Sequence, residues 1–332
     1  MKFSLIICTY MRPTALLRLL KTVATQSLYP DEILIIDGSI DNATQEIIEK
    51  NKFKNLIYYK VEAAQRGLTK QRNLGVEKLR KDIDFVCFLD DDTLLSIDYF
   101  KNIQEVFISD ANITGVGGIA TNENNWKLNS SDYYNQKKYI SIDGYHVKLG
   151  QRHVLRNYLG LGSNKPPGIM PEFSNGLSCG YPLIGKNYTV DLLIGMSMSF
   201  RRSVVDTIKF STYFEGYGLY EDADFSLRAL QFGKNVLATN VQLEHHHDAA
   251  GRPNKFKYGK MVTRNGWYVW RVKYAKPKLR ARFKWNAIAI VLILLRFVNI
   301  FTTKKKLEAF TEALGRFYGL LSLIFNKPSV QR

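Results

Sequence analysis

Glycine is missing where a dinucleotide-binding enzyme needs it. The first apolar run, residues 3–8, leads into Thr9-Tyr10-Met11-Arg12-Pro13 and not into G-x-G-x-x-G. This argues against a hydride-transfer enzyme. No Gly-rich triphosphate loop follows that run either, which weighs against a sugar nucleotidyltransferase.

Cysteine is also scarce. The three cysteines, Cys8, Cys87 and Cys179, show no metal-ligand spacing, and two of them lie in apolar runs typical of buried strands. A reducing compartment is therefore favoured. The first apolar run stops after six residues and no small-residue cleavage site follows it, so we expect a strand there and a start of the chain in the cytosol.

Acidic residues almost disappear from the last quarter of the sequence. The formal net charge is +17, and residues 252–332 contain 19 Lys or Arg but only Glu308 and Glu312, which is 19 − 2 = +17. Residues 1–251 are therefore neutral, with 28 bases and 28 acids. We expect two domains, at residues 1–251 and 252–332.

Strand-like and helix-like segments alternate through the first 90 residues. Apolar runs at 3–8, 32–37, 56–61 and 84–89 are separated by helical patterns, the first with Leu16, Leu19, Leu20 and Val23 on one face. This alternation predicts an α/β fold with a mostly parallel central sheet, flanking helices and a ligand crevice at the carboxyl ends of the strands. Further strands are expected at 192–203 and 235–247, a helix at 220–233, and a C-terminal helical extension.

Three consecutive carboxylates follow the fourth run. Asp90, Asp91 and Asp92 repel one another and raise each other's proton affinity unless something positive lies among them. Mg²⁺ and Mn²⁺ prefer such oxygen ligands. The alternative is an acidic turn in which Asp98 caps the next helix.

Five motifs in order resemble the inverting glycosyltransferases of family 2, which have the GT-A fold. They are CTYMR, IIDGSID, QRGLTKQRNLGV, FLDDD and YGLYEDADFSLRA, and the resemblance covers about residues 3–250. It implies a nucleotide-diphosphate sugar donor of UDP or dTDP type. It further implies donor contacts by Thr9, Tyr10, Arg12, Asp37, Arg72, Asn73, Asp90 and Asp91. Alternatives remain for several of them: helix entry for Thr9, an Asp-Gly turn for Asp37, and a solvated helix face for Arg72.

The same resemblance implies the catalytic groups. Asp222 occupies the position of the base that takes the proton of the acceptor hydroxyl, and Asp92 with Asp90 would ligate the cation. His245 or His247, which period-two alternation places on one side of the strand away from His246, would complete the metal shell. Glu221, Gly195 and Ser197 would lie on the acceptor side. The alternatives are acids that only suit a helix N-terminus, surface histidines, and small residues kept for packing.

The basic tail contains an apolar stretch at residues 285–303, about 28 Å long as a helix and so close to the thickness of a bilayer core. Arg296 interrupts it, and Lys284 and Lys304 flank it, so positive charge keeps both ends on one side. We expect helices that lie on or dip into an anionic membrane at its cytoplasmic face, with Leu307, Phe310, Leu314, Phe317 and Leu321 on a second apolar face. A buried hairpin, on the catalytic domain or in an oligomer, is the alternative.

The sequence therefore predicts a metal-dependent inverting glycosyltransferase that acts on a glycan or lipid-linked acceptor in cell-envelope polysaccharide synthesis. No nucleic-acid partner is expected. The competing hypotheses are a catalytically inactive GT-A-fold adaptor, at the membrane or on nucleic acid, and the nucleotidyltransferase already disfavoured.

Overall fold

The computed structural model describes residues 1–129, 135–177, 180–247 and 253–331, so Cys179 lies outside the described residues. The chain forms two compact units, Met1–Asn124 with Leu183–Arg252 and Asn125–Pro182 with Pro253–Arg332. Residues 125–182, expected in the first domain, group with the C-terminal helices in the second compact unit. Compact units are defined by contacts and not by independent folding, so the domain boundary at residue 251 stays a prediction.

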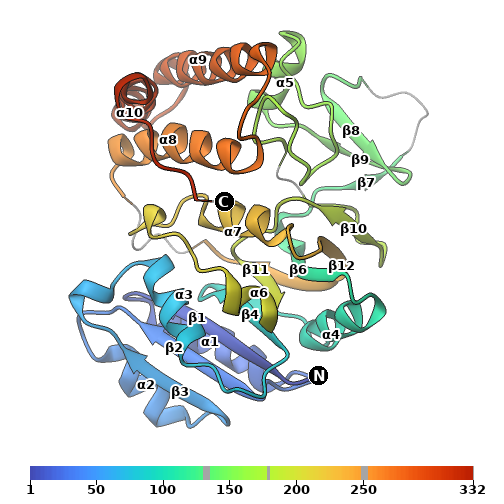
Figure 1. The fold of residues 1–332 in the computed structure, drawn as a ribbon, viewed down its shortest axis with the longest axis vertical. Helices are drawn as coiled ribbons and strands as arrows, with labels where there is room; N and C mark the ends of the chain where they lie inside the picture. The colour runs from blue at the N-terminus through green and yellow to red at the C-terminus, as the bar shows by residue number, and fades with distance from the viewer. Residues whose placement is uncertain (130–134, 178–179, 248–252, 332) are drawn as a thin grey trace. The chain divides into compact units, whose positions relative to one another are not determined.

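The first unit is built on one central sheet (Figure 1). In the described residues the strand order is β10-β12-β6-β11-β4-β1-β2-β3, with β5 paired to β12. The strands are β1 Phe3–Thr9, β2 Glu32–Asp37, β3 Leu56–Lys60, β4 Phe85–Asp90, β5 Thr93–Leu95, β6 Ile113–Ala120, β10 Asn187–Val190, β11 Ser197–Arg201 and β12 Lys234–His245.

Most of this sheet runs in one direction. β1 pairs in parallel with β2 and β4, β2 with β3, and β6 with β12. Because β11 is antiparallel to both β4 and β6, the β6–β12 pair points the same way as β1 to β4. The predicted α/β class with a mostly parallel central sheet is confirmed. The strand expected at 192–203 is shorter than predicted, because it begins only at Ser197.

Helices connect these strands. They are α1 Pro13–Ala24, α2 Ala43–Asn51, α3 Leu68–Glu77, α4 Tyr99–Ser109, α6 Arg202–Thr207 and α7 Glu221–Ala229, with 3₁₀ turns η1 Ala63–Gln65, η2 Thr121–Glu123 and η3 Thr212–Phe214. Pro13 starts α1, where its missing N–H has no cost. On α3, Gly75 allows close approach, since a Cβ there would lie 2.7 Å from Ile6 Cγ2.

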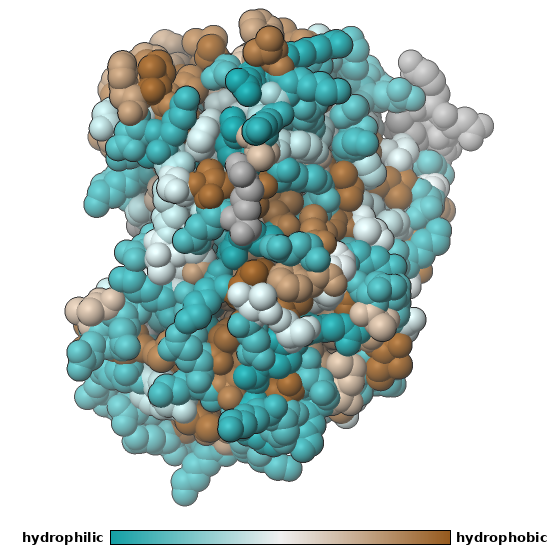
Figure 2. Space-filling model, viewed as in Figure 1, coloured by the Kyte–Doolittle hydropathy of each residue, from teal (hydrophilic) through white to brown (hydrophobic). Residues whose placement is uncertain are grey.

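The second unit contains the C-terminal helices and a small sheet. Its elements are β7 Lys127–Leu128, β8 Tyr139–Ile142, β9 Tyr145–Lys148, α5 Gln151–Tyr158, α8 Lys255–Lys273, α9 Leu279–Thr302 and α10 Lys306–Phe325. The predicted C-terminal helical extension is confirmed. Of the described helices, α9 is long and apolar enough to cross a membrane. In Figure 2, hydrophobic side chains gather at the upper left, where Figure 1 places α10 and the adjoining end of α9.

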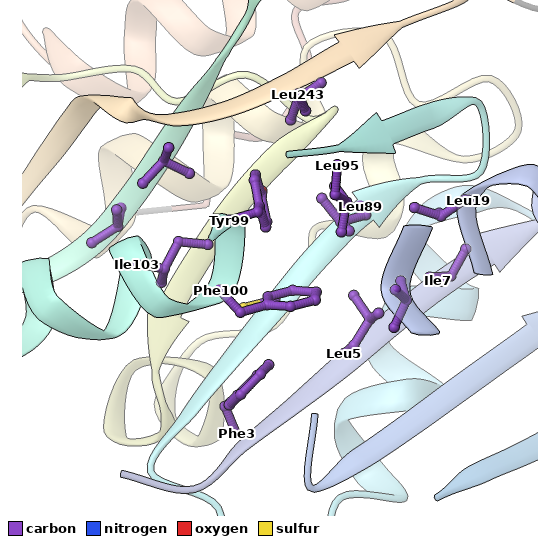
Figure 3. Packing of buried hydrophobic residues seen from close by; sticks show 14 of the residues in the cluster. Phe3, Leu5, Ile7, Leu19, Leu89, Leu95, Tyr99, Phe100, Ile103 and Leu243 are labelled. Carbon is purple, nitrogen blue, oxygen red and sulfur yellow. The ribbon is translucent and has the colours of Figure 1, made fainter. Parts of the chain in front are cut away.

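Alternation along β1 decides which side chains enter the main core. Phe3, Leu5 and Ile7 are fully buried on one face of the sheet, together with Leu19 from α1 and Phe100 from α4 (Figure 3). Ile6 points to the opposite face, against α3. A parallel strand of continuous apolar residues is buried on both faces. This packing holds the strands in place, so their polar ends lie together at one edge of the sheet.

Candidate active site

The carboxyl ends of the strands collect the predicted polar residues. Thr9, Asp37 and Asp90 are the last residues of β1, β2 and β4, and His245 ends β12. The registers place Thr9 beside Asp37 and Asp90 beside Cys8. The ends of parallel strands therefore form one polar edge, as the alternation predicted.

Two arginines and a histidine lie among the three aspartates. Arg12 Nη1 is 3.1 Å from Asp91 Oδ1 and 3.5 Å from Asp92 Oδ2. Thr9 donates its hydroxyl to Asp91 Oδ2 at 2.7 Å. Burial raises the pKa of Asp91 to about 7, although Arg12 and Thr9 both favour its carboxylate. Side chains of the protein thus relieve part of the crowding that the sequence analysis attributed to a cation.

Asp90, Asp92 and His245 form a group whose ligand atoms all lie within 4.8 Å of one another. Two carboxylates with one imidazole suit Mn²⁺ or Mg²⁺, so these residues fit the predicted cation. His245 Nε2 lies 3.3 Å from Asp92 Oδ1. Burial lowers the pKa of His245, but Asp92, Asp90 and Glu123 outweigh it, and the net shift is upward.

His247 belongs to a different group. His247 is grouped with His245 and Glu123 and not with the aspartates. Its Nε2 lies 2.7 Å from Glu123 Oε1. The rings of His245 and His247 are 4.0 Å apart, while His246 turns to Glu244. β12 ends at His245, two residues before the predicted end of this strand, so strand alternation does not extend to His247. Of the three histidines, His245 is the one grouped with Asp90 and Asp92, and its role as a metal ligand stays a prediction.

Arg72 is buried behind the aspartates and links them to α7. Its Nη1 pairs with Glu221 Oε1, and its Nη2 lies 3.4 Å from Asp90 Oδ1 and donates to Gly195 O at 3.3 Å. The side chain is only 2% exposed, which rules out the solvated helix face. Both terminal nitrogens of Arg72 already contact protein groups. A contact from Arg72 to the donor stays a prediction.

Asp222 is held in a fixed orientation at the start of α7. Its Oδ2 accepts from Gly195 N at 2.9 Å and its Oδ1 from Ala223 N at 2.8 Å. Burial raises the pKa of Asp222 even though both N–H groups oppose the shift. An oriented carboxylate with raised proton affinity suits a general base.

Glu221, its neighbour, is more deeply buried. Burial raises the pKa of Glu221 to about 8 against the effect of Arg72, with Asp222 and Asp90 adding to the rise. Its Oε2 makes no hydrogen bond within the described residues. Glu221 is therefore a buried, partly unsatisfied acid beside Asp222.

Several predicted residues lie elsewhere or have other contacts. Asn73 pairs with both backbone groups of Phe210 at 2.9 and 2.8 Å, and Ser197 Oγ accepts from Gly118 N at 2.9 Å inside the protein. Asp37 accepts from Ser39 N and from the Tyr58 hydroxyl, both at 2.8 Å. Tyr10 is 43% exposed beyond β1, and Gly195 lies in the loop before β11. Their donor and acceptor roles stay predictions.

Other contacts were foreseen or missed. Within α7, Arg228 Nη2 is 2.6 Å from Asp224 Oδ2. Sequence reasoning missed Glu123 and Gln71, whose amide donates to Thr9 O and Ile36 O. Gln71 lies within the motif QRGLTKQRNLGV but was given no role, and Glu123 lies outside all five motifs, so only the fold brings it to His245.

Comparison with known families agrees with this geometry. Residues 4–158 match the family model described as "Glycosyl transferase family 2". The match covers a little under half of the chain. Over 119 residues the chain is 31% identical to the O-antigen chain rhamnosyltransferase RfbN of Salmonella typhimurium. The aligned stretch covers 36% of this chain and only 37% of that protein.

Solved glycosyltransferases share the fold. The chain resembles S. aureus TarS 1-349 with a TM-score of 0.53 at 17% identity, over 98% of this chain and 81% of that one. It resembles the mannosyltransferase PcManGT of Pyrobaculum calidifontis, determined with GDP-Man and Mn²⁺, with a TM-score of 0.55 at 12% identity, over 98% and 88%. At these identities the likeness shows the fold alone, and the expected GT-A architecture is confirmed.

Proposed function

We propose that this protein is a metal-dependent inverting glycosyltransferase that moves one sugar from a nucleotide-diphosphate donor to a hydroxyl of a glycan or lipid-linked acceptor. One observation carries the proposal. A continuous set of contacts runs from the group Asp90–Asp92–His245 through Arg72 to Glu221 and Gly195, and Gly195 orients Asp222. The proposed donor-side and acceptor-side groups therefore belong to one site.

The reaction assigns a role to each group. The Asp222 carboxylate takes the proton of the acceptor hydroxyl while its oxygen bonds to the anomeric carbon and the bond from that carbon to the diphosphate breaks. A divalent cation, when bound by Asp90, Asp92 and His245, supplies charge neutralisation for the departing nucleotide diphosphate. Arg12 offsets the remaining charge of Asp91 and Asp92.

Asp222→Asn tests the assignment. We expect a loss of transfer of at least about 10²-fold because the amide cannot accept the proton. Donor binding, measured by calorimetry with Mn²⁺ and a panel of nucleotide sugars, should remain. Retained transfer, or the loss of both transfer and donor binding, would contradict the assignment of Asp222 as the base.

The same measurements separate the alternatives. The anomeric configuration of the product, read by NMR, tests inversion, and donor affinity unchanged in EDTA would contradict the metal role. An inactive adaptor would give no turnover with any donor. A nucleotidyltransferase would consume a nucleoside triphosphate.

We further propose that α9 and α10 attach the protein to the cytoplasmic face of an anionic membrane. Exposed apolar residues follow one face of α9, at Leu279, Phe283, Ile290, Leu294, Val298 and Phe301. The predicted second face continues on α10 with Leu307, Phe310, Phe317 and Leu321, all exposed. Lys304 and Lys305 lie between the two helices and Lys306 begins α10, where all three can meet anionic headgroups.

In this arrangement Arg296 is paired with an acidic residue of α10 and does not face lipid as an unpaired charge. Its Nη2 lies 2.8 Å from Glu312 Oε2, and Glu312 Oε1 is 2.7 Å from Arg316 Nη2. Glu312 is almost fully buried. Because this network ties the middle of α9 to α10, it favours a hairpin lying on the membrane over a single spanning helix. The alternative is that the same apolar faces of α9 and α10 bind a second copy of the chain and form an oligomer.

A further inference from the structure

We propose that Glu123 is a positioning residue of the metal site: it holds the imidazole of His245 so that Nε2 faces Asp90 and Asp92. The inference rests on the proposed function, because it concerns the same cation. Nothing in the five sequence motifs points to Glu123.

The first support is the contact itself. His245 Nδ1 lies 3.1 Å from Glu123 Oε1, and His245 Nε2 lies 3.3 Å from Asp92 Oδ1 on the other side of the ring. A carboxylate oxygen only accepts hydrogen bonds, so Nδ1 carries a proton toward Glu123. Nε2 faces Asp92 on the other side of the ring, so with Nδ1 held by Glu123 it is Nε2 that would give up its proton and bind a cation held by Asp90 and Asp92.

The backbone fixes the distance between the two residues. Asn122 binds both main-chain groups of His245: its Nδ2 donates to His245 O at 2.8 Å, and its Oδ1 accepts from His245 N at 3.0 Å. This pairing holds η2 against the end of β12 and brings the next residue, Glu123, to the imidazole. Such rigid placement is what an orienting group requires.

A second histidine restrains Glu123. His247 Nε2 lies 2.7 Å from the same Oε1 atom, so one carboxylate oxygen receives two imidazoles. Metal-bound histidines generally donate their other ring N–H to a carboxylate, which fixes the tautomer, and loss of that partner costs about 10- to 100-fold in metal affinity. His247 thus contributes to the site by restraining Glu123 and not as a ligand.

Mn²⁺ binding to the full-length protein, measured by electron paramagnetic resonance without nucleotide sugar, tests the proposal. We expect Glu123→Ala to weaken Mn²⁺ binding about 10- to 100-fold. Glu123→Gln should retain much of the affinity, because its amide oxygen still accepts from Nδ1. Glu244→Ala is the matched control: it removes an exposed glutamate that meets His246, and it should leave the affinity unchanged.

A spectroscopic readout separates orientation from charge. Long-range ¹H–¹⁵N spectra with Mg²⁺ bound should show His245 protonated at Nδ1 in the wild type and a change of tautomer population in Glu123→Ala. Wild-type affinity in Glu123→Ala, or equal losses in Glu123→Ala and Glu123→Gln, would overturn the positioning role.

Asp92→Ala distinguishes this inference from the proposed function. If Asp92→Ala abolishes Mn²⁺ binding and Glu123→Ala does not weaken it, the inference fails while the proposed metal site stands. If the wild type binds no Mn²⁺, both fail.

Discussion

Arg72 shows how much one side chain supports at this site. Its guanidinium neutralises part of Glu221 and Asp90, lies 5.3 Å from the centre of the Phe210 ring, and donates to the carbonyl of Gly195. The N–H of that same glycine orients Asp222. Arg72 therefore stabilises the fold and the geometry of the proposed base at once.

Arg72→Met should destabilise the protein because Glu221 and Asp90 lose their buried cationic partner, and the loss should grow as the pH rises past the Glu221 pKa of about 8. Urea denaturation measures the change. The control is Arg80→Met, which breaks a surface pair with Asp82 and should leave the urea midpoint unchanged. Equal midpoints for wild type and Arg72→Met would show that the buried pair contributes little.

The sequence predicted the residues at the strand ends better than their partners. The strand pattern placed Thr9, Asp37 and Asp90 at one edge, because carboxyl ends of parallel strands meet there, whereas His245 was implied only by the family resemblance. It could not show that Ser197 and Asn73 are used inside the protein, since motif positions do not report burial. Glu123 was out of reach for the same reason: η2 meets β12 only through a tertiary contact.

Among the elements, α8 and α10 are packed through glycines. A Cβ on Gly259 would collide with the backbone of Glu312 and Arg316, and one on Gly315 with the backbone of Phe256. A Cβ on Gly319 would lie 3.0 Å from Lys260 O. The sequence analysis described α10 by its apolar residues, whereas small residues decide which face packs against α8.

Gly315→Ala should destabilise the protein by about 1–3 kcal/mol, because the added methyl group has only backbone atoms to displace. Thermal unfolding followed by circular dichroism measures the effect. Gly150→Ala is the control, since a Cβ on Gly150 would have no other atom within 4 Å and the φ of −62° at this residue suits alanine. Matching melting temperatures for the two variants would contradict close packing.

Across the whole molecule, charge is distributed unevenly along the chain. Residues 1–251 balance their charges and contain the proposed site, whereas the excess of 17 positive charges lies in residues 252–332 with α8, α9 and α10. Basic charge beside exposed apolar faces is the combination that binds anionic membranes.

Leu294→Glu should reduce flotation with vesicles containing anionic phosphatidylserine by roughly an order of magnitude, because it places a charge on the exposed apolar face of α9. Ile108→Glu is the matched control, an exposed apolar residue on α4 that should leave flotation unchanged. If Leu294→Glu floats normally but changes the sedimentation mass, the same face serves an oligomer.

The glycine contacts between α8 and α10 also restrict how the C-terminal helices can move. The close backbone approach at Gly259, Gly315 and Gly319, together with the Thr263 hydroxyl that donates to Arg316 O, leaves little room for α8 and α10 to slide past each other, so we expect them to move as one body. A force on α10 would then be carried to α8, while α9 is joined to the pair through the short connections Tyr274–Lys278 and Thr303–Lys305. In the proposed docking on a membrane, α8 and α10 would therefore respond as one rigid element.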